Sequence, residues 1–118
     1  MSYIDGFVLA VPRDQLAAYR RLSRKAGKVW KELGALAYWE CVGDDVPDGK
    51  TTSFPKSVKL KDGEVVVFSW IHYASRTQRD RINAKAMADP RIASMSPSEM
   101  PFDSTRMIFG GFKPMVSL

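Results

Sequence analysis

The segment Glu64–Tyr73 limits the possible folds more than any other part of the chain. It reads Glu-Val-Val-Val-Phe-Ser-Trp-Ile-His-Tyr, so β-branched and aromatic residues dominate, and apolar side chains occupy both odd and even positions. A strand with one face in water alternates apolar and polar residues, whereas a strand covered on both faces does not. The segment Tyr3–Val11 shows the same pattern. The sequence therefore predicts strands that are covered on both faces.

Two helices are predicted between the strands. From Asp14 to Leu33 the apolar residues fall on one arc at about 100° per residue, and Gly34 suits the position just after a helix. A second helix begins at the capping box Ser75–Gln78 and runs to about Ala88. Asp89-Pro90 then ends this helix and can start a further turn, with the aspartate as N-cap.

Three further strands are predicted. Ala35–Val42 is the second strand and Arg106–Val116 the last, where Gly110-Gly111 indicates a bulge or a close approach of the backbone. Lys56–Lys61 alternates apolar residues with lysines, which suits a short edge strand. Asp62-Gly63 is a hairpin signal that would join this edge strand to Glu64–Tyr73.

Apart from the short edge strand, the order strand, helix, strand, strand, helix, strand predicts an α+β fold of the ferredoxin-like βαββαβ type. Its four-stranded antiparallel sheet carries both helices on one face, and residues 1–118 form a single domain. Two helices cover only one face of the sheet, yet the strands are apolar on both. A second copy of the chain, packed sheet against sheet, is the simplest cover. We therefore expect a homodimer of the dimeric α/β-barrel type.

The composition favours a cytoplasmic protein. A single cysteine, Cys41, excludes an internal disulfide framework and suits a reducing compartment. No apolar run approaches the roughly 20 residues that a membrane span needs. The chain enters strand-like sequence at Tyr3, without the basic and apolar regions of a secretory signal.

The basic face of the first predicted helix has two interpretations. Its six cations lie opposite the apolar arc, and the net charge of the chain is +5. The face consists of Arg20, Arg21, Arg24, Lys25, Lys28 and Lys31. Such a stripe can bind nucleic acid or phosphate, or it can be an ordinary solvated surface. Aromatic residues do not alternate with the cations, as a base-stacking platform would require, so the solvated surface is favoured and nucleic acid is not an expected partner.

Few side chains offer chemistry. His72, the only histidine, is the only candidate for a general base near neutral pH, and Glu40 is a second catalytic candidate. His72 shares strand parity with Trp70, so both face the same way; it can equally be a hydrogen-bonded residue without chemistry. The candidate ligand-binding residues are Tyr38, Trp39, Trp70 and Arg106. If several converge, they would form an aromatic pocket with a few polar groups.

No cofactor or metal ion is expected. The sequence has no phosphate loop, dinucleotide fingerprint, His-Glu-x-x-His pattern or nucleophile elbow. The loop at Asp44, Asp45 and Asp48 resembles a calcium loop only superficially, because Val46 and Pro55 stand where liganding residues are needed. These aspartates are better explained as turn residues.

Several motifs resemble an uncharacterised bacterial family, the YbaA-like domain of unknown function, over essentially the whole chain. The motifs are Tyr3-Ile4-Asp5-Gly6-Phe7, Glu40-Cys41 followed by Gly43-Asp44-Asp45-Val46-Pro47-Asp48-Gly49-Lys50, Phe54-Pro55, Val66-Val67-Phe68-Ser69-Trp70, Arg79-Asp80, Asp89-Pro90-Arg91, Met100-Pro101-Phe102-Asp103, Arg106-Met107-Ile108 and Gly110-Gly111-Phe112. The resemblance implies the dimeric α/β-barrel superfamily. It implies no function, because the family has none established, and no catalytic residue is carried over.

Three functions follow as hypotheses. The first is a small-molecule enzyme or binder with a planar or apolar ligand, for which His72, Glu40 or Arg106 supplies the polar group. The second is a dimeric structural or interaction module without chemistry. The third is a nucleic-acid binder that uses the basic helix face.

The irregular segment Ala93–Asp103, with its methionines, is either a connector or a flap over a pocket. Catalysis and simple binding both remain open at this point.

Overall fold

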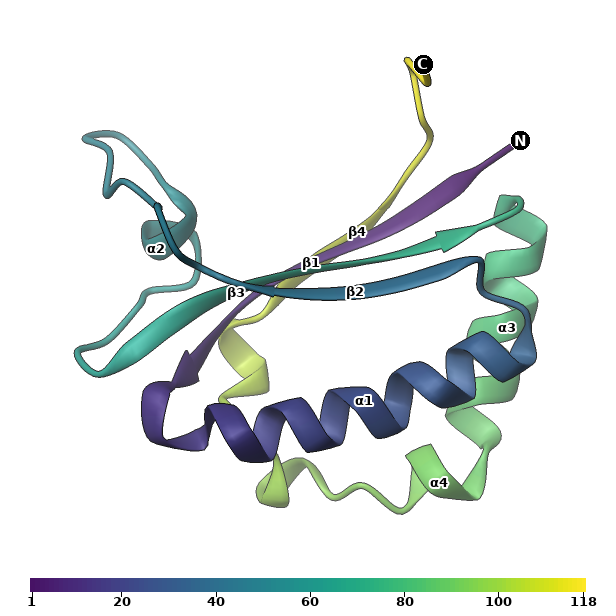
Figure 1. Ribbon diagram of the computed structural model, residues 1–118, viewed down its shortest axis with the longest axis horizontal. Helices are drawn as coiled ribbons and strands as arrows, with labels where there is room; N and C mark the ends of the chain where they lie inside the picture. Colours follow the sequence, from purple (N-terminus) through teal and green to yellow (C-terminus); the bar gives the residue numbers. More distant parts are fainter.

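The computed structural model of the chain describes residues 1–118, except for the side chain of Pro97. Four strands form one sheet, and the long helices α1 and α3 lie on the same side of it (Figure 1). The elements in chain order are β1 (Tyr3–Pro12), a 3₁₀ turn (Arg13–Gln15), α1 (Leu16–Leu33), β2 (Ala37–Val42), α2 (Phe54–Ser57), β3 (Glu64–Tyr73), α3 (Arg76–Ala88), α4 (Pro90–Ala93), 3₁₀ turns (Pro97–Glu99 and Ser104–Arg106) and β4 (Ile108–Phe112).

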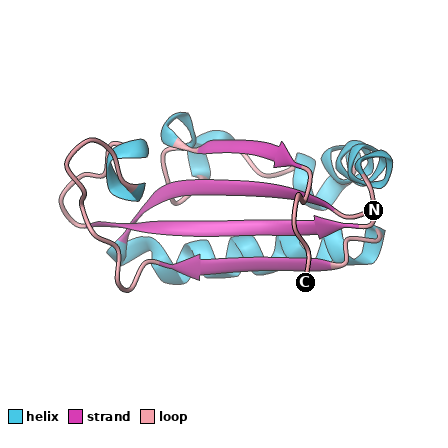
Figure 2. Ribbon diagram, turned by 90° about the horizontal axis from the view of Figure 1, so that it is seen from above, coloured by secondary structure: helices cyan, strands magenta, loops and turns pink.

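The sheet has the strand order β2-β3-β1-β4, and all its pairings are antiparallel (Figure 2). β1 and β3 are the two central strands and pair over their full lengths, from Tyr3 opposite Tyr73 to Pro12 opposite Glu64. These are the two segments whose apolar pattern is two-sided. The predicted α+β class and the four-stranded antiparallel sheet are confirmed.

The helix side of the sheet carries most of the core. Odd-numbered residues of β1 and β3 point to this side, and Val11, Val67 and Tyr73 are almost inaccessible to solvent. Val11 and Val67 pack against Tyr19 of α1, and Tyr73 packs against Ile82 of α3. α1 covers this face because its apolar arc meets the mainly apolar rows of the central strands, and α3 adds the buried side chains of Ile82 and Ala86.

The opposite side of the sheet, here called the outer face, is only partly covered within one chain. At one end Val58, which follows α2, packs against Val8 and Val66. Elsewhere the outer face presents large exposed apolar side chains. These are Trp39, Phe68, Ile108 and Phe112, with exposed fractions of 57%, 42%, 46% and 62%.

The helix ends follow the predicted local signals. The backbone at Gly34, with φ of 121°, ends α1. Ser75 Oγ accepts a hydrogen bond from the backbone N–H of Gln78 at the start of α3. Asp89 caps α4 in the same way, through the N–H of Arg91. Nowhere in the described chain is a helix both long and apolar enough to cross a membrane.

The predicted edge strand Lys56–Lys61 is wrong. Ser53 Oγ accepts from the N–H of Lys56, and Pro55 lies in the first turn, so this stretch begins as the short helix α2. Lys59 has φ of 49°, which no strand residue adopts. The N-cap and the proline outweigh the alternation of apolar residues and lysines. The turn at Gly63 does lead into β3, but it joins no hairpin.

Two predicted strands are shorter than expected. β2 begins at Ala37, because the chain turns at Gly34 after α1. β4 begins at Ile108, because Asp103 caps a 3₁₀ turn that includes Arg106. Both differences lie at element ends, where local caps decide the boundary.

Candidate functional site

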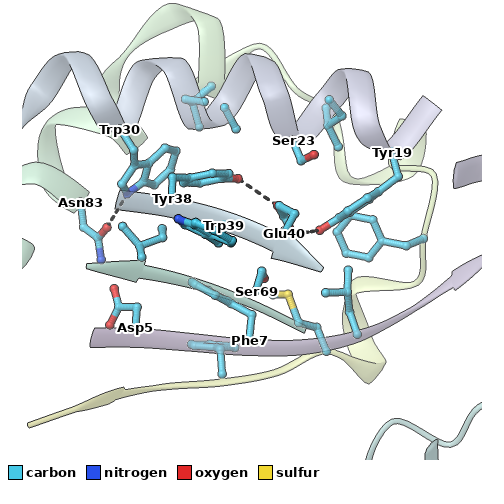
Figure 3. A pocket seen from close by; sticks show the side chains of 18 of the residues that line it. Asp5, Phe7, Tyr19, Ser23, Trp30, Tyr38, Trp39, Glu40, Ser69 and Asn83 are labelled. Atoms are coloured by element: carbon cyan, nitrogen blue, oxygen red, sulfur yellow. Dashed lines mark hydrogen bonds between the residues drawn. The ribbon is translucent and has the colours of Figure 1, made fainter. Parts of the chain in front are cut away.

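A cavity of about 590 Å³ lies between the helix side of the sheet and helices α1 and α3 (Figure 3). Its floor consists of two rows of residues that run across all four strands. Going from β2 to β4, the first row is Glu40, Ser69, Phe7 and Phe109, and the second is Tyr38, Ile71, Asp5 and Gly111. A carboxyl group thus occupies each row, one on the edge strand β2 and one on the central strand β1.

The walls of the cavity are apolar. Helix α1 contributes Leu22, Ala26 and Trp30, and α3 contributes Met87. The segment that follows α3 closes the cavity with Ile92, Met95, Met100, Phe102 and Met107. The irregular segment 93–103 therefore lies over a pocket, as one of its two interpretations expected.

Glu40 is held at one end of the cavity by two tyrosines. The hydroxyl of Tyr19 donates to Glu40 Oε1 at 2.8 Å, and that of Tyr38 donates to Oε2 at 3.1 Å. Burial raises the pKa of Glu40, while the hydrogen bonds from Tyr19, Tyr38 and Ser69 act in the opposite direction. Burial and the adjacent carboxylate raise the pKa of both tyrosines, so they remain protonated donors.

Asp5 and Arg79 form a second polar group in the cavity. Asp5 is 6% exposed, and its Oδ1 lies 3.7 Å from Arg79 Nε. Burial raises the pKa of Asp5, and the charge of Arg79 opposes this increase. The guanidinium of Arg79 lies over the ring of Tyr3, 4.8 Å from its centroid, and Nη2 donates to the Tyr3 hydroxyl at 3.0 Å. Arg79 Nε also lies 3.3 Å from Asp80 Oδ1.

Asn83 links this polar group to the helices. Its Oδ1 accepts hydrogen bonds from Trp30 Nε1 at 3.0 Å and from the Tyr73 hydroxyl at 3.2 Å. Figure 3 shows Asn83 between Trp30 and Asp5. The amide thus fixes the orientation of the Trp30 indole in the cavity wall.

Gly111 leaves room for this arrangement. A Cβ at this position would lie 2.7 Å from Arg79 Nη2 and would also collide with Tyr3. The β1–β4 register runs without interruption from Ile4 opposite Phe112 to Val8 opposite Ile108. The glycine pair therefore marks a close approach and no bulge.

Of the predicted site residues, Tyr38 and Glu40 line the cavity. Trp39 also lines it, although its ring lies on the outer face and stacks on Trp70 with centroids 5.5 Å apart. Trp70 and His72 occupy even positions of β3 and therefore face away from the cavity. His72 Nε2 lies 2.7 Å from Ser2 Oγ. The expectation that His72 shares a pocket with Glu40 is corrected, because strand parity separates them.

Arg106, the remaining candidate ligand-binding residue, also lies outside the cavity lining. Its guanidinium donates to both carboxylate oxygens of Glu64, at 2.8 and 2.6 Å, and to Asp103 Oδ2 at 3.1 Å. A further hydrogen bond reaches the carbonyl of Lys59. Arg106 therefore joins the end of the irregular segment to β3.

The sequence interpretation missed Asp5, Arg79 and Asn83. One signal was available: Asp5 is the only charged residue in the apolar run Tyr3–Val11. A charge inside a strand that is buried on both sides requires a partner. Within the described residues, no cluster of three or more histidine, cysteine, aspartate or glutamate side chains is arranged to hold a metal ion.

Solved structures show which class of fold surrounds this cavity. Rv0793 from Mycobacterium tuberculosis superposes with a TM-score of 0.59 and 14% identity, over 99% of this chain and 98% of that one. A NIPSNAP domain protein from Burkholderia xenovorans gives 0.58 and 12%, over 95% and 93% of the two chains. At such identities the likeness shows the fold alone, which is the α+β fold of NIPSNAP-type proteins.

Sequence relatives define the family. The proteins named "Uncharacterized protein YbaA" from Escherichia coli strain K12 and from Shigella flexneri are each 52% identical over 116 residues, which is 98% of both chains. The chain belongs to the family described as "Protein of unknown function (DUF1428)", which matches residues 2–104. The resemblance to YbaA-like proteins is thus confirmed.

Proposed function

We propose that this protein is a homodimer that binds a small apolar or aromatic molecule in the cavity between sheet and helices. The observation that carries this proposal is a cavity of about 590 Å³ lined mainly by aromatic, aliphatic and methionine side chains, with a few polar groups. Small-molecule sites usually have volumes of about 300–1,000 Å³ and this kind of lining. The charged groups are restricted to Glu40, Asp5 and Arg79.

Glu40 is the group that would move a proton if the ligand is converted as well as bound. Its carboxyl borders the cavity, and burial raises its pKa, which brings a carboxyl closer to the range where it can both donate and accept a proton. Tyr19 and Tyr38 hold both of its oxygens in place. His72 lies on the other face of the sheet, so Glu40 is the stronger of the two catalytic candidates.

Filling the cavity tests the binding proposal. Ala26 lines the cavity from α1, whereas Ala84 lies exposed on α3, so Ala26→Phe and Ala84→Phe are a matched pair. We expect the neutral dye N-phenylnaphthylamine to fluoresce with the wild-type protein and with Ala84→Phe. Its affinity for Ala26→Phe should be weaker by about tenfold or more, about 1.4 kcal/mol. Equal binding by both variants, or no binding by the wild type, would refute the proposal.

The outer face supports the homodimer. Trp39, Phe68, Ile108 and Phe112 leave apolar surface in water in a single chain. Interface cores are rich in aromatic residues and poor in charge, and two sheets can pack face to face at about 10 Å. A second copy would offer the same patch across a two-fold axis.

Static light scattering tests the dimer. We expect a dimer at micromolar concentration, and Phe68→Glu should shift it toward the monomer, because a carboxylate would be buried without a partner. Arg24→Glu, on the exposed face of α1, changes charge without touching the outer face and should leave the dimer intact. A monomeric wild-type protein would refute the dimer. A dimer that binds no small molecule would favour a second function, that of an interaction module without chemistry.

A further inference from the structure

The charges around the cavity are not balanced. Two carboxyl groups, Asp5 and Glu40, and one guanidinium, Arg79, line it. Arg79 is engaged by Asp5 at 3.7 Å, by Asp80 at 3.3 Å and by the Tyr3 hydroxyl. Among the described residues no cationic group lies within 4.0 Å of Glu40.

Glu40 is held by neutral donors only. Tyr19, Tyr38 and Ser69 are the side chains that hydrogen-bond to it. Basic residues of α1, Arg20, Arg24, Lys28 and Lys31, line a groove on the solvent side of Glu40, but none of them pairs with it. A carboxylate oxygen has two lone pairs, and each oxygen of Glu40 receives one tyrosine hydrogen bond. Ser69 takes a third of the four acceptor positions, so one position is left for a ligand.

Aromatic rings line the same cavity as Glu40. Five aromatic side chains of the lining come from the strands, from α1 and from the segment that follows α3. They are Phe7, Trp30, Tyr38, Phe102 and Phe109. The faces of aromatic rings attract cations, most strongly in places that exclude water. Methionine sulfur is polarisable and adapts to ligands of different shape. A cavity with an aromatic lining and a carboxyl that has no cationic partner suits an organic cation with an apolar body.

We propose that the ligand of this cavity is an organic cation, an aromatic or alicyclic amine whose ammonium group pairs with Glu40 while its apolar body lies among the aromatic rings. The inference rests on the small-molecule binding proposed above and specifies its ligand class. An anion would meet two carboxyl groups, and the single guanidinium already forms ion pairs with Asp5 and Asp80, although its buried Nε makes no hydrogen bond. A neutral ligand would leave Glu40 without a counter-charge, which costs more in an apolar site than in water.

Three probes of similar shape and different charge test the inference by isothermal titration calorimetry. They are naphthylmethylammonium, naphthylmethanol and naphthoate. We expect the ammonium to bind the wild-type protein at least about tenfold more tightly than the alcohol, and the anion to bind most weakly. Glu40→Gln should bring the affinities for ammonium and alcohol to within about twofold of each other.

Glu32→Gln is the matched control. Glu32 lies exposed on α1 in the solvent-side groove and pairs with Arg91 at 2.9 Å. This variant removes the same charge outside the cavity and should keep the preference for ammonium.

The outcomes separate the two proposals. Equal or tighter binding of the alcohol or the anion by the wild type would overturn the cation inference and leave small-molecule binding standing. A preference for ammonium that survives in Glu40→Gln would overturn the role of Glu40. If no probe binds the wild type and the neutral dye also fails to bind, the binding proposal falls and the inference falls with it.

Discussion

Replacing Gly111 by alanine adds one methyl group at the point where the side chains of Tyr3 and Arg79 lie against the backbone of β4. The new Cβ would lie 2.7 Å from Arg79 Nη2 and 2.7 Å from Tyr3 Cε2, and closer still to the Tyr3 hydroxyl. Tyr3 is 6% exposed and has little room to move. The methyl group would therefore displace both side chains and disturb the hydrogen bond that holds Arg79 beside Asp5.

The expected loss of stability follows from these contacts. Overpacking in a filled site costs about 1–3 kcal/mol, and a hydrogen bond from a charged group contributes about 1.5–3 kcal/mol. Because the two effects share the same side chains, we expect a total of about 2–4 kcal/mol. Gly110→Ala is the matched control on the same strand. Its Cβ would meet only the Phe112 ring, at 3.6 and 3.7 Å, which is ordinary contact, so its stability should change by less than about 1 kcal/mol.

Urea unfolding followed by tryptophan fluorescence measures both variants. With a slope of about 1–3 kcal/mol per molar urea, Gly111→Ala should lower the midpoint by about 1 M or more, and Gly110→Ala should stay near the wild type. All samples need the same protein concentration, because the stability of the proposed dimer would depend on it. Coinciding midpoints for the two variants would refute the crowding of Tyr3 and Arg79 over Gly111.

Two further predictions concern charge. Arg106→Met removes two hydrogen bonds to Glu64, whose side chain is 8% exposed, and should cost about 2–3 kcal/mol in urea unfolding. Arg76→Met removes an exposed ion pair with Asp80, whose side chain is 60% exposed, and should cost less than about 1 kcal/mol. A similar loss in both would contradict the importance of the Glu64 pair. Because the pKa of Glu40 is raised above 4.5, its usual value, the folded chain holds this proton to higher pH than the unfolded chain. Its contribution to stability is then complete below about pH 4.5 and declines as pH rises through the raised pKa. Glu40→Gln lacks this decline, so its stability relative to the wild type should improve between about pH 4 and pH 8 in unfolding series; a constant difference would contradict the raised pKa.

The secondary structure was predictable where its causes are local. Ser75 and Asp89 cap helices within a few residues of themselves, and Gly34 ends α1 by its own backbone conformation. The same reasoning fails at Lys56–Lys61, where the alternation of apolar residues and lysines predicts a strand but the cap at Ser53 begins a helix. Local signals of different kinds can thus conflict, and a cap with a following proline overrides a weak alternation.

The site was predictable only in part, for a different reason. β3 is apolar at both parities, so the sequence could not show which parity faces the helices. Trp70 and His72 fell on the outer face, while Tyr38 and Glu40 of β2 fell on the cavity side. The contribution of Met95 and Met100 to the wall depends on where an irregular segment packs, which no local pattern encodes.

The segment that covers the cavity and the sheet that forms its floor come from different parts of the chain. The floor arises from strand pairing, whereas most of the cover comes from one continuous stretch, residues 92–107. Asp89 anchors this stretch at its start and the Arg106–Glu64 pair anchors it at its end. Substitutions between these two anchors can reshape the cavity without changing any strand register. The ligand preference of the proposed site can therefore diverge during evolution, and can be altered by loop exchange in the laboratory, while the sheet stays the same.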